Sequence, residues 1–154
     1  MKFIKGLIII LLVIIRPISV FAEKVLTPLE IQSMQTREYS QGIDIVFPSV
    51  VSVFQDLGYM VKSADKSSGF INAESPAITK TAFLGGRDVY QTAATGFIER
   101  IGKITRVRLS FVVTKNIYLG LGDQKRQDTP IVDAPVYSNA FEKIENAIFV
   151  RSQQ

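Results

Sequence analysis

Catalytic chemistry has few residue types to work with in this chain, because its 154 residues include no histidine and no cysteine. Mechanisms that pair serine or cysteine with histidine are therefore excluded, as are zinc sites built on imidazole or thiolate. A carboxylate pair of Glu99 with Asp88 or Asp123 would need a separation of about 5–9 Å. Nothing in the sequence sets the distance between these carboxylates. We expect no catalytic residue and no cofactor.

Three aspartates at intervals of five, Asp123, Asp128 and Asp133, are the remaining candidates for a cation site. A calcium-binding loop places its oxygen ligands at alternate residues, so an interval of five does not match that pattern. Lys125 and Arg126 lie among these aspartates and balance their charge. We therefore expect a solvated loop and no metal site.

Basic residues gather on and beside the polar face of the clearest strand of the sequence: Arg100, Lys103, Arg106 and Arg108. They are candidates for a patch on the open side of a sheet that binds an anionic ligand. If the protein is exported, as its first 22 residues predict (see below), the anionic partners are phospholipid headgroups, lipopolysaccharide or acidic protein surfaces. The alternative interpretation is a charged face that keeps the sheet soluble, with Glu99 and other acids compensating these cations.

Residues 115–133 are predicted as a long loop in which Ile117, Tyr118, Leu119 and Leu121 are interleaved with two glycines. Loops longer than about 12–15 residues without structure of their own are often functional. Exposed apolar residues would let this loop anchor a partner protein. In the alternative interpretation, Tyr118 and Leu119 continue the preceding strand and pack on the core.

The first 22 residues have the features of a secretory signal peptide. Two lysines precede the apolar run "GLIIILLVII", and the segment ends on Val20-Phe21-Ala22. A membrane-spanning helix needs about 20 apolar residues, and Arg16-Pro17 interrupts this run earlier. We expect cleavage after Ala22 and a periplasmic location, with an uncleaved membrane anchor as the alternative. The absence of cysteine excludes anchoring through a lipidated cysteine.

Removal of this leader also changes the charge of the protein. Of the 154 residues 132 remain, with 15 basic and 14 acidic side chains, because Lys2, Lys5 and Arg16 are lost. The basic character of the full chain therefore belongs largely to the leader, and we expect no nucleic-acid binding. A mature chain of this length suits one domain, held together by burial and without disulfides.

The first part of the mature chain is predicted as an irregular arm over 23–33, a strand over 34–40 and then a helix. The apolar residues of that helix recur at spacings of one, three and four between Val46 and Leu57, which is typical of an amphipathic helix. Pro48 is expected in its first turn, where the missing N–H costs little. Gly58 stands where a left-handed capping residue ends a helix.

Two strand-like runs, "YMVKSAD" and "GFINAE", follow this helix and are joined by "KSSG". Gly69 supplies the positive φ that a tight hairpin connection requires. A phosphate-binding glycine loop would instead follow a strand and open a helix. The glycines of this stretch are therefore predicted to be structural.

The second part of the chain is predicted as a hairpin and a final helix. A strand over 91–101 turns at Gly102-Lys103 into a strand over 104–114, in which Val107, Leu109, Phe111 and Val113 lie on one face and Arg106, Arg108 and Ser110 on the other. Such one-sided burial indicates an antiparallel sheet with helices on a single face. Asp133 and Pro135 are placed to begin the final helix, whose buried stripe is Tyr137, Phe141, Ile144 and Ile148. We predict an α+β fold, in one domain over 34–154, with an antiparallel sheet of four to five strands and two helices packed on one face.

Two blocks of the sequence, "FQDLGYMVKSADKSSGFINAESP" and "DTPIVDAPVYSNAFEKIENAIFVR", resemble small uncharacterised exported proteins and lipoproteins of Gram-negative bacteria. The order of elements is also similar, more weakly, to the α+β domains of the outer-membrane assembly lipoprotein C. The resemblance implies the fold and a location in the cell envelope, and it carries no catalytic residue. Many members have a lipidated cysteine after the leader, which this chain lacks.

The function predicted from these observations is a non-catalytic envelope module that works through contacts with an envelope protein. The competing hypothesis is a binding domain for an anionic envelope lipid or glycan through the basic sheet face.

Overall fold

The computed structural model describes residues 26–81, 86–118 and 124–153. Its elements follow one another as three helices and seven strands. They are α1 (Pro28–Gln35), β1 (Thr36–Tyr39), α2 (Ile43–Asp56), β2 (Met60–Asp65), β3 (Phe70–Glu74), β4 (Ile78–Thr81), β5 (Arg87–Ile101), β6 (Ile104–Tyr118), β7 (Gln124–Pro130) and α3 (Ala134–Ser152). The predicted α+β class is confirmed, whereas the expected four to five strands and two helices are too few.

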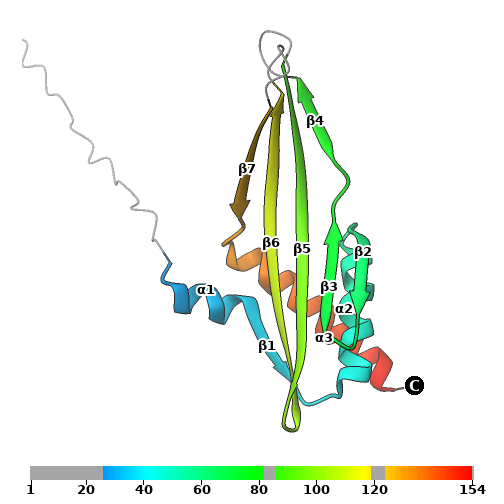
Figure 1. The fold of residues 1–154 in the computed structure, drawn as a ribbon. Helices are drawn as coiled ribbons and strands as arrows, with labels where there is room; N and C mark the ends of the chain where they lie inside the picture. Colours follow the sequence, from blue (N-terminus) through cyan, green and yellow to red (C-terminus); the bar gives the residue numbers. More distant parts are fainter. Residues whose placement is uncertain (1–25, 82–85, 119–123, 154) are drawn as a thin grey trace, which may run out of the picture.

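All strands belong to one antiparallel sheet built around the long β5–β6 hairpin (Figure 1). Along one half of this hairpin the strand order is β1-β6-β5-β3-β2. Along the other half β4 pairs with β5 and β7 pairs with β6. We call this second part the extension; it comprises β4, residues 87–93 of β5, residues 112–118 of β6, and β7.

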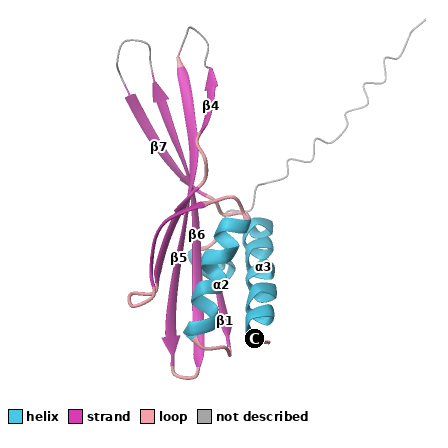
Figure 2. Cartoon of the chain, turned by 90° about the vertical axis from the view of Figure 1, so that its right-hand side faces the viewer, coloured by secondary structure: helices cyan, strands magenta, loops and turns pink. Residues whose placement is uncertain are grey.

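Helices α2 and α3 lie side by side on one face of the first half of the sheet, and the extension projects beyond them (Figure 2). Strand alternation points Ile71, Ala94, Ile98, Val107 and Leu109 toward these helices, and all five are buried. The aromatic rings of Phe54, Phe111 and Tyr137 join the two helices to the sheet. The core therefore lies between one sheet face and two helices, as the alternation in the sequence predicted.

Helix α2 forms because apolar residues at helical spacing meet this core, and Val46, Val50, Val53 and Phe54 are buried. It begins at Ile43, three residues before the predicted start, because Ile43 and Ile45 also pack against the core. Pro48 is consequently the sixth residue of the helix and not part of its first turn, which corrects the prediction.

The C-terminus of α2 ends as expected at Gly58, with φ +85°. The Tyr59 N–H donates to the Phe54 carbonyl at 2.9 Å, and the Gly58 N–H donates to the Gln55 carbonyl at 2.9 Å. These two bonds are those of a Schellman motif, and the contact between the Phe54 and Tyr59 rings supplies its apolar component. The prediction of a helix cap at Gly58 is confirmed.

Helix α1 begins within the segment 23–33 that was predicted to be an irregular arm, and its last two residues, Met34 and Gln35, were predicted as the start of the strand over 34–40. Thr27 and Glu30 form a capping box, and Pro28 occupies the first turn. The sequence "TPLE" carries this signal, since a threonine followed three residues later by glutamate is typical of a helix start. The arm prediction missed it because α1 has no buried residue and so no apolar stripe.

The predicted β2–β3 hairpin is confirmed, with Gly69 at φ +72°. The final helix is confirmed as well: Pro135 lies in its first turn, and the predicted stripe is buried. Asp133 stands at the N-cap position, but its side chain makes no capping hydrogen bond. The Tyr137 hydroxyl donates to the Ile131 carbonyl at 2.9 Å and accepts from the Phe111 N–H at 3.4 Å. This hydroxyl therefore ties α3 to β6 and to the segment that follows β7.

The predicted loop over 115–133 is wrong for most of its length. Residues 115–118 continue β6, and β7 pairs with them in register from Val112↔Pro130 to Tyr118↔Gln124. The pattern failed here because every residue of β7 is exposed, so no alternation of apolar and polar residues marks the strand. Exposed strand β4 lies in a stretch with no clear signal for the same reason.

Candidate functional site

The sheet face opposite α2 and α3, which we call the open face, carries an exposed pair of aromatic side chains. Phe70 of β3 and Phe97 of β5 lie directly opposite each other and are 45% and 42% exposed. Each belongs to a Gly-Phe-Ile tripeptide, at 69–71 and 96–98, and the two tripeptides pair antiparallel. Because alternate residues of a strand face opposite sides, the isoleucines enter the core and the phenylalanines face outward.

Helix α1 flanks this face and forms a hollow of about 400 Å³ with it. Leu29, Gln32 and Ser33 of α1 form one wall, and Phe97, Arg106 and Arg108 form the floor on the sheet. Leu29 is 75% exposed, so an apolar side chain stands on each side of the hollow. Strand β1 connects this wall to the sheet through its pairing with β6.

The four cations that were predicted to form one basic patch are divided by the structure. Arg106 and Arg108 lie on the open face, as their alternation with Val107 and Leu109 predicted. Arg100 lies on the other side of β5, the side of buried Ile98 and of the two helices. Its charge acts on Asp44 at the start of α2. Lys103 lies in the β5–β6 turn at the end of the hairpin. The predicted single patch is therefore not formed.

Carboxylates neutralise the open face further. Arg106 lies between Glu38 of β1 and Glu99 of β5 in cross-strand register. Its guanidinium contacts Glu38 at 2.9 Å and Glu99 at 3.6 Å. Such exposed pairs contribute about 0–1 kcal/mol each, so they set the charge of the surface more than its stability. The compensation by acids that the alternative interpretation expected is observed.

Arg108 differs from Arg106, because no carboxylate of the described residues lies within ion-pair distance of it. It is exposed and lies between Thr36 and Phe97 in the register of β1, β6 and β5. An apolar pair and one uncompensated cation therefore stand together on the open face. A signal for the outward phenylalanines is present in the sequence, because each strand has two large apolar residues in succession, Phe and then Ile. Successive residues of a strand face opposite sides, so one of the two must face outward.

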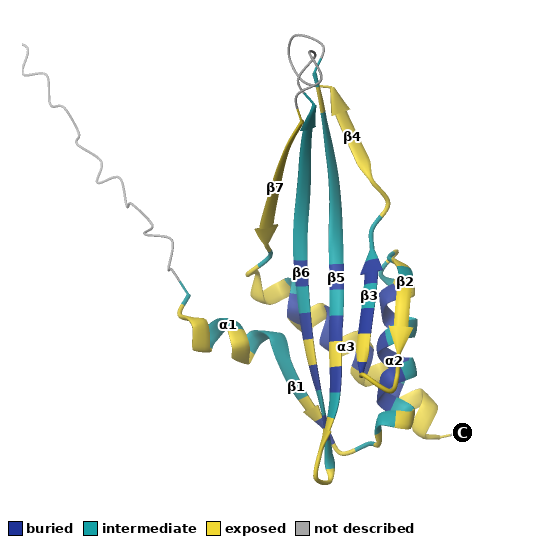
Figure 3. Ribbon diagram, viewed as in Figure 1, coloured by how far each residue is buried: buried dark blue, intermediate teal, exposed yellow. Residues whose placement is uncertain are grey.

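The residues predicted to form a partner loop do not act as one group. Ile117 and Tyr118 are successive residues of β6, so they face opposite sides of the extension. Leu119 and Leu121 lie outside the described residues. The expectation that Tyr118 continues the strand is confirmed, although it is only partly buried. Figure 3 shows that the buried part of β6 lies in the other half of the strand.

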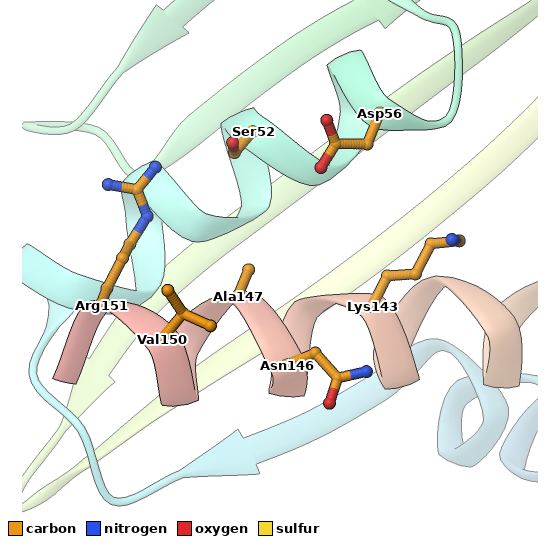
Figure 4. A pocket seen from close by; sticks show the side chains of 7 residues that line it. All are labelled: Ser52, Asp56, Lys143, Asn146, Ala147, Val150 and Arg151. Atoms are coloured by element: carbon orange, nitrogen blue, oxygen red, sulfur yellow. The ribbon is translucent and has the colours of Figure 1, made fainter. Parts of the chain in front are cut away.

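A second hollow, of about 480 Å³, lies between α2 and α3 on their outer side (Figure 4). Ser52 and Asp56 of α2 face Lys143 and Arg151 of α3 across it. No hydrogen bond or ion pair joins these side chains among the described residues. The hollow is a shallow groove of mixed charge.

The carboxylate pair that was considered for catalysis is not formed in the described part of the chain. Asp88 and Glu99 lie eleven residues apart on the same strand, which is roughly 36 Å at the rise of an extended chain. Asp123 lies outside the described residues. Among the residues that are described, no three acidic side chains gather where they could hold a metal ion. Likewise, none of the described helices has the length and apolar character needed to cross a membrane.

Comparison with protein-family models and with curated protein sequences finds no match to this chain.

Proposed function

We propose that this protein is a non-catalytic interaction module of the cell envelope and that a partner protein binds its open face. The observation that carries the proposal is the exposed pair Phe70 and Phe97 on a sheet face that α2 and α3 leave uncovered. Full burial of an exposed phenylalanine contributes about 1.5–3 kcal/mol, and Phe70 and Phe97, already more than half buried, would each contribute a part of that. Aromatic anchors of this kind carry much of the binding energy of protein interfaces.

The chemistry of the surface defines the partner segment that fits it. Leu29, Phe70 and Phe97 offer contact to an apolar side chain, and the hollow beside α1 gives that side chain a place. Arg108, without a carboxylate partner in the described structure, offers hydrogen bonds to an acidic one. The proposed partner therefore presents an apolar residue next to an aspartate or glutamate.

The competing hypothesis, an anionic lipid or glycan bound by the basic sheet face, has less support. Glu38 and Glu99 neutralise Arg106, and Arg100 belongs to the other face. Binding carried by apolar contact should persist in high salt, whereas binding to an anion through exposed cations should not.

The test is co-purification from the envelope fraction with the mature protein as bait. The double variant Phe70→Thr/Phe97→Thr removes the aromatic pair but keeps residues that favour strands. Its matched control is Phe149→Gln, which removes a phenylalanine that is 65% exposed on α3. We expect the same partner to be retained in high salt by the wild type and the control and to be lost by the double variant. Equal retention by all three proteins would refute the proposed binding face.

A further inference from the structure

The net positive charge of the described residues lies in the extension. Its described residues carry five basic and two acidic side chains, a net of +3. The other described residues carry nine basic and ten acidic side chains, a net of −1. The extension is also the part of the sheet that neither α2 nor α3 covers (Figure 2).

The charge is concentrated at the far end of the extension. The last four cross-strand rows run from Tyr90↔Lys115 to Arg87↔Tyr118 and span roughly 10 Å. They contain all five cations, Lys80, Arg87, Lys115, Lys125 and Arg126, and a single carboxylate, Asp88. The net charge of these rows is therefore +4. The sequences that connect the strands contain one charged residue, Asp123, which reduces this net charge to +3.

Three of these cations have no carboxylate within ion-pair distance among the described residues. Lys115 contacts Asp88 at 2.8 Å and Arg126 contacts Asp128 at 3.0 Å, whereas Lys80, Arg87 and Lys125 have no such contact. Lys80, Arg87 and Lys125 are also exposed. An anionic surface can therefore reach them without first breaking an ion pair.

The cations are arranged for a planar surface and not for a ligand that lies on one sheet face. Alternation places Lys80, Lys115 and Lys125 on one face and Arg87 and Arg126 on the other. Cations on both faces meet a single binding surface only if that surface approaches the end of the extension. A ligand that lies along one sheet face would contact the cations of that face alone.

Two tyrosines stand among these cations. The Arg87 guanidinium lies 4.8 Å from the centre of the Tyr118 ring, and the ammonium groups of Lys80 and Lys115 lie 5.3 and 5.4 Å from that of Tyr90. Tyrosine is enriched where a protein meets the membrane–water interface, because its ring is apolar and its hydroxyl is polar. Basic residues beside interfacial tyrosines favour a bilayer as the anionic partner.

We propose that the far end of the extension binds the surface of an anionic phospholipid bilayer, with lipid phosphates contacting Lys80, Arg87 and Lys125. This inference is independent of the proposed binding of a protein partner, because it uses the opposite half of the sheet from Phe70 and Phe97. Both contacts are compatible with one molecule, since the open face remains free when the end of the extension is on a membrane.

Vesicle flotation with the mature protein tests the proposal. We expect binding to phosphatidylcholine vesicles that contain about 30% phosphatidylglycerol at about 0.05 M salt, and loss of binding at about 0.5 M salt. Arg87→Gln/Lys125→Gln removes one cation without an ion pair from each face of the extension. Each basic residue near an anionic bilayer contributes about 1 kcal/mol, so this variant should bind roughly 30-fold more weakly.

Lys103→Gln/Arg108→Gln is the matched control, because it removes the same two residue types from exposed positions in the other half of the sheet. Its affinity for the vesicles should change less than about twofold. Because the chain has no cysteine, a dye can also be attached to Thr79→Cys in β4 or to Gln55→Cys in α2. Quenchers attached to lipid headgroups should lower the fluorescence of the dye at position 79 and leave that of the dye at position 55 unchanged.

Three results would overturn the proposal. They are equal binding to vesicles of phosphatidylcholine alone, equal weakening by the two double variants, and binding to duplex DNA without binding to vesicles. All substituted residues are exposed, so unchanged thermal unfolding of each variant is expected and shows that any loss is a loss of binding.

Discussion

Replacement of Gly69 by alanine should show that this glycine is required for the contact of two strands and not only for a turn. Gly69 has φ +72°, and it immediately precedes β3. A Cβ added there would lie 1.9 Å from the carbonyl oxygen of Ile98 in β5. The Ile98 N–H also donates to the Gly69 carbonyl at 2.8 Å. An alanine therefore cannot be accommodated unless β3 moves away from β5.

The expected cost combines two effects. A left-handed conformation of a residue with a side chain costs about 1–2 kcal/mol, and loss of the Gly69–Ile98 hydrogen bond costs about 0.5–1.5 kcal/mol more. Gly69→Ala should therefore lower the free energy of unfolding by about 1.5–3.5 kcal/mol. Gly58 offers the matched control, because it has φ +85° and no atom within 4 Å of an added Cβ. Gly58→Ala should cost about 1–2 kcal/mol, the left-handed effect alone.

Urea unfolding of the mature protein, followed by circular dichroism, measures both costs. With an unchanged slope, the midpoint of Gly69→Ala should fall further than that of Gly58→Ala, by the equivalent of about 0.5–1.5 kcal/mol. In thermal unfolding each kcal/mol corresponds to roughly 3–5 °C for a domain of this size. Equal losses for the two variants would refute the argument, because the contact with Ile98 would then contribute nothing.

The remaining predictions concern buried hydroxyls, acid sensitivity and processing. Tyr137→Phe should destabilise by about 1–3 kcal/mol in urea, because it leaves buried backbone groups without their partner. Tyr39→Phe should be neutral or stabilising, since the buried Tyr39 hydroxyl has no hydrogen-bond partner in the described structure; a loss as large as that of Tyr137→Phe would contradict this. The side-chain hydroxyl of Ser67 lowers the pKa of Asp65 through a hydrogen bond, and Lys66 lowers that of Asp44 in the same way. Both carboxylates should stabilise the fold above the unfolded-state pKa of about 3.9 and lose that effect as the pH falls through the folded-state values. Asp65→Asn should thus reduce the loss of stability between about pH 5 and pH 2, and an unchanged pH profile would reject the linkage. N-terminal sequencing of protein from the periplasmic fraction should begin at Glu23, whereas a chain that keeps its first 22 residues and resists carbonate extraction from membranes would reject cleavage.

Elements with strong local patterns were predictable from the sequence alone. The stripe of α2, its end at Gly58, the hairpin with Gly69, the alternation of β6 and the stripe of α3 all agree with the structure. Each depends either on the periodic burial of neighbouring residues or on a glycine at positive φ, so the information lies within a short window of the chain. The α+β class with helices on one sheet face follows from these same patterns.

Three elements without a buried residue escaped that reasoning. Helix α1 and strands β4 and β7 contain no buried residue, so hydrophobic periodicity does not mark them. Strands β4 and β7 form because the long β5–β6 hairpin offers them hydrogen-bonding edges. Such pairing is a tertiary effect, and a β propensity read from local sequence does not capture it.

The distribution of charge is the feature that only the tertiary structure decided. The sequence determined that Arg106 and Arg108 share a face, because they are two residues apart on one strand. It did not determine that Glu38, 68 residues away, neutralises Arg106. Nor did it show that Lys80, Arg87 and Lys125 meet at one end of the sheet. Cross-strand register sets these contacts, and register depends on how distant segments pair around a common core.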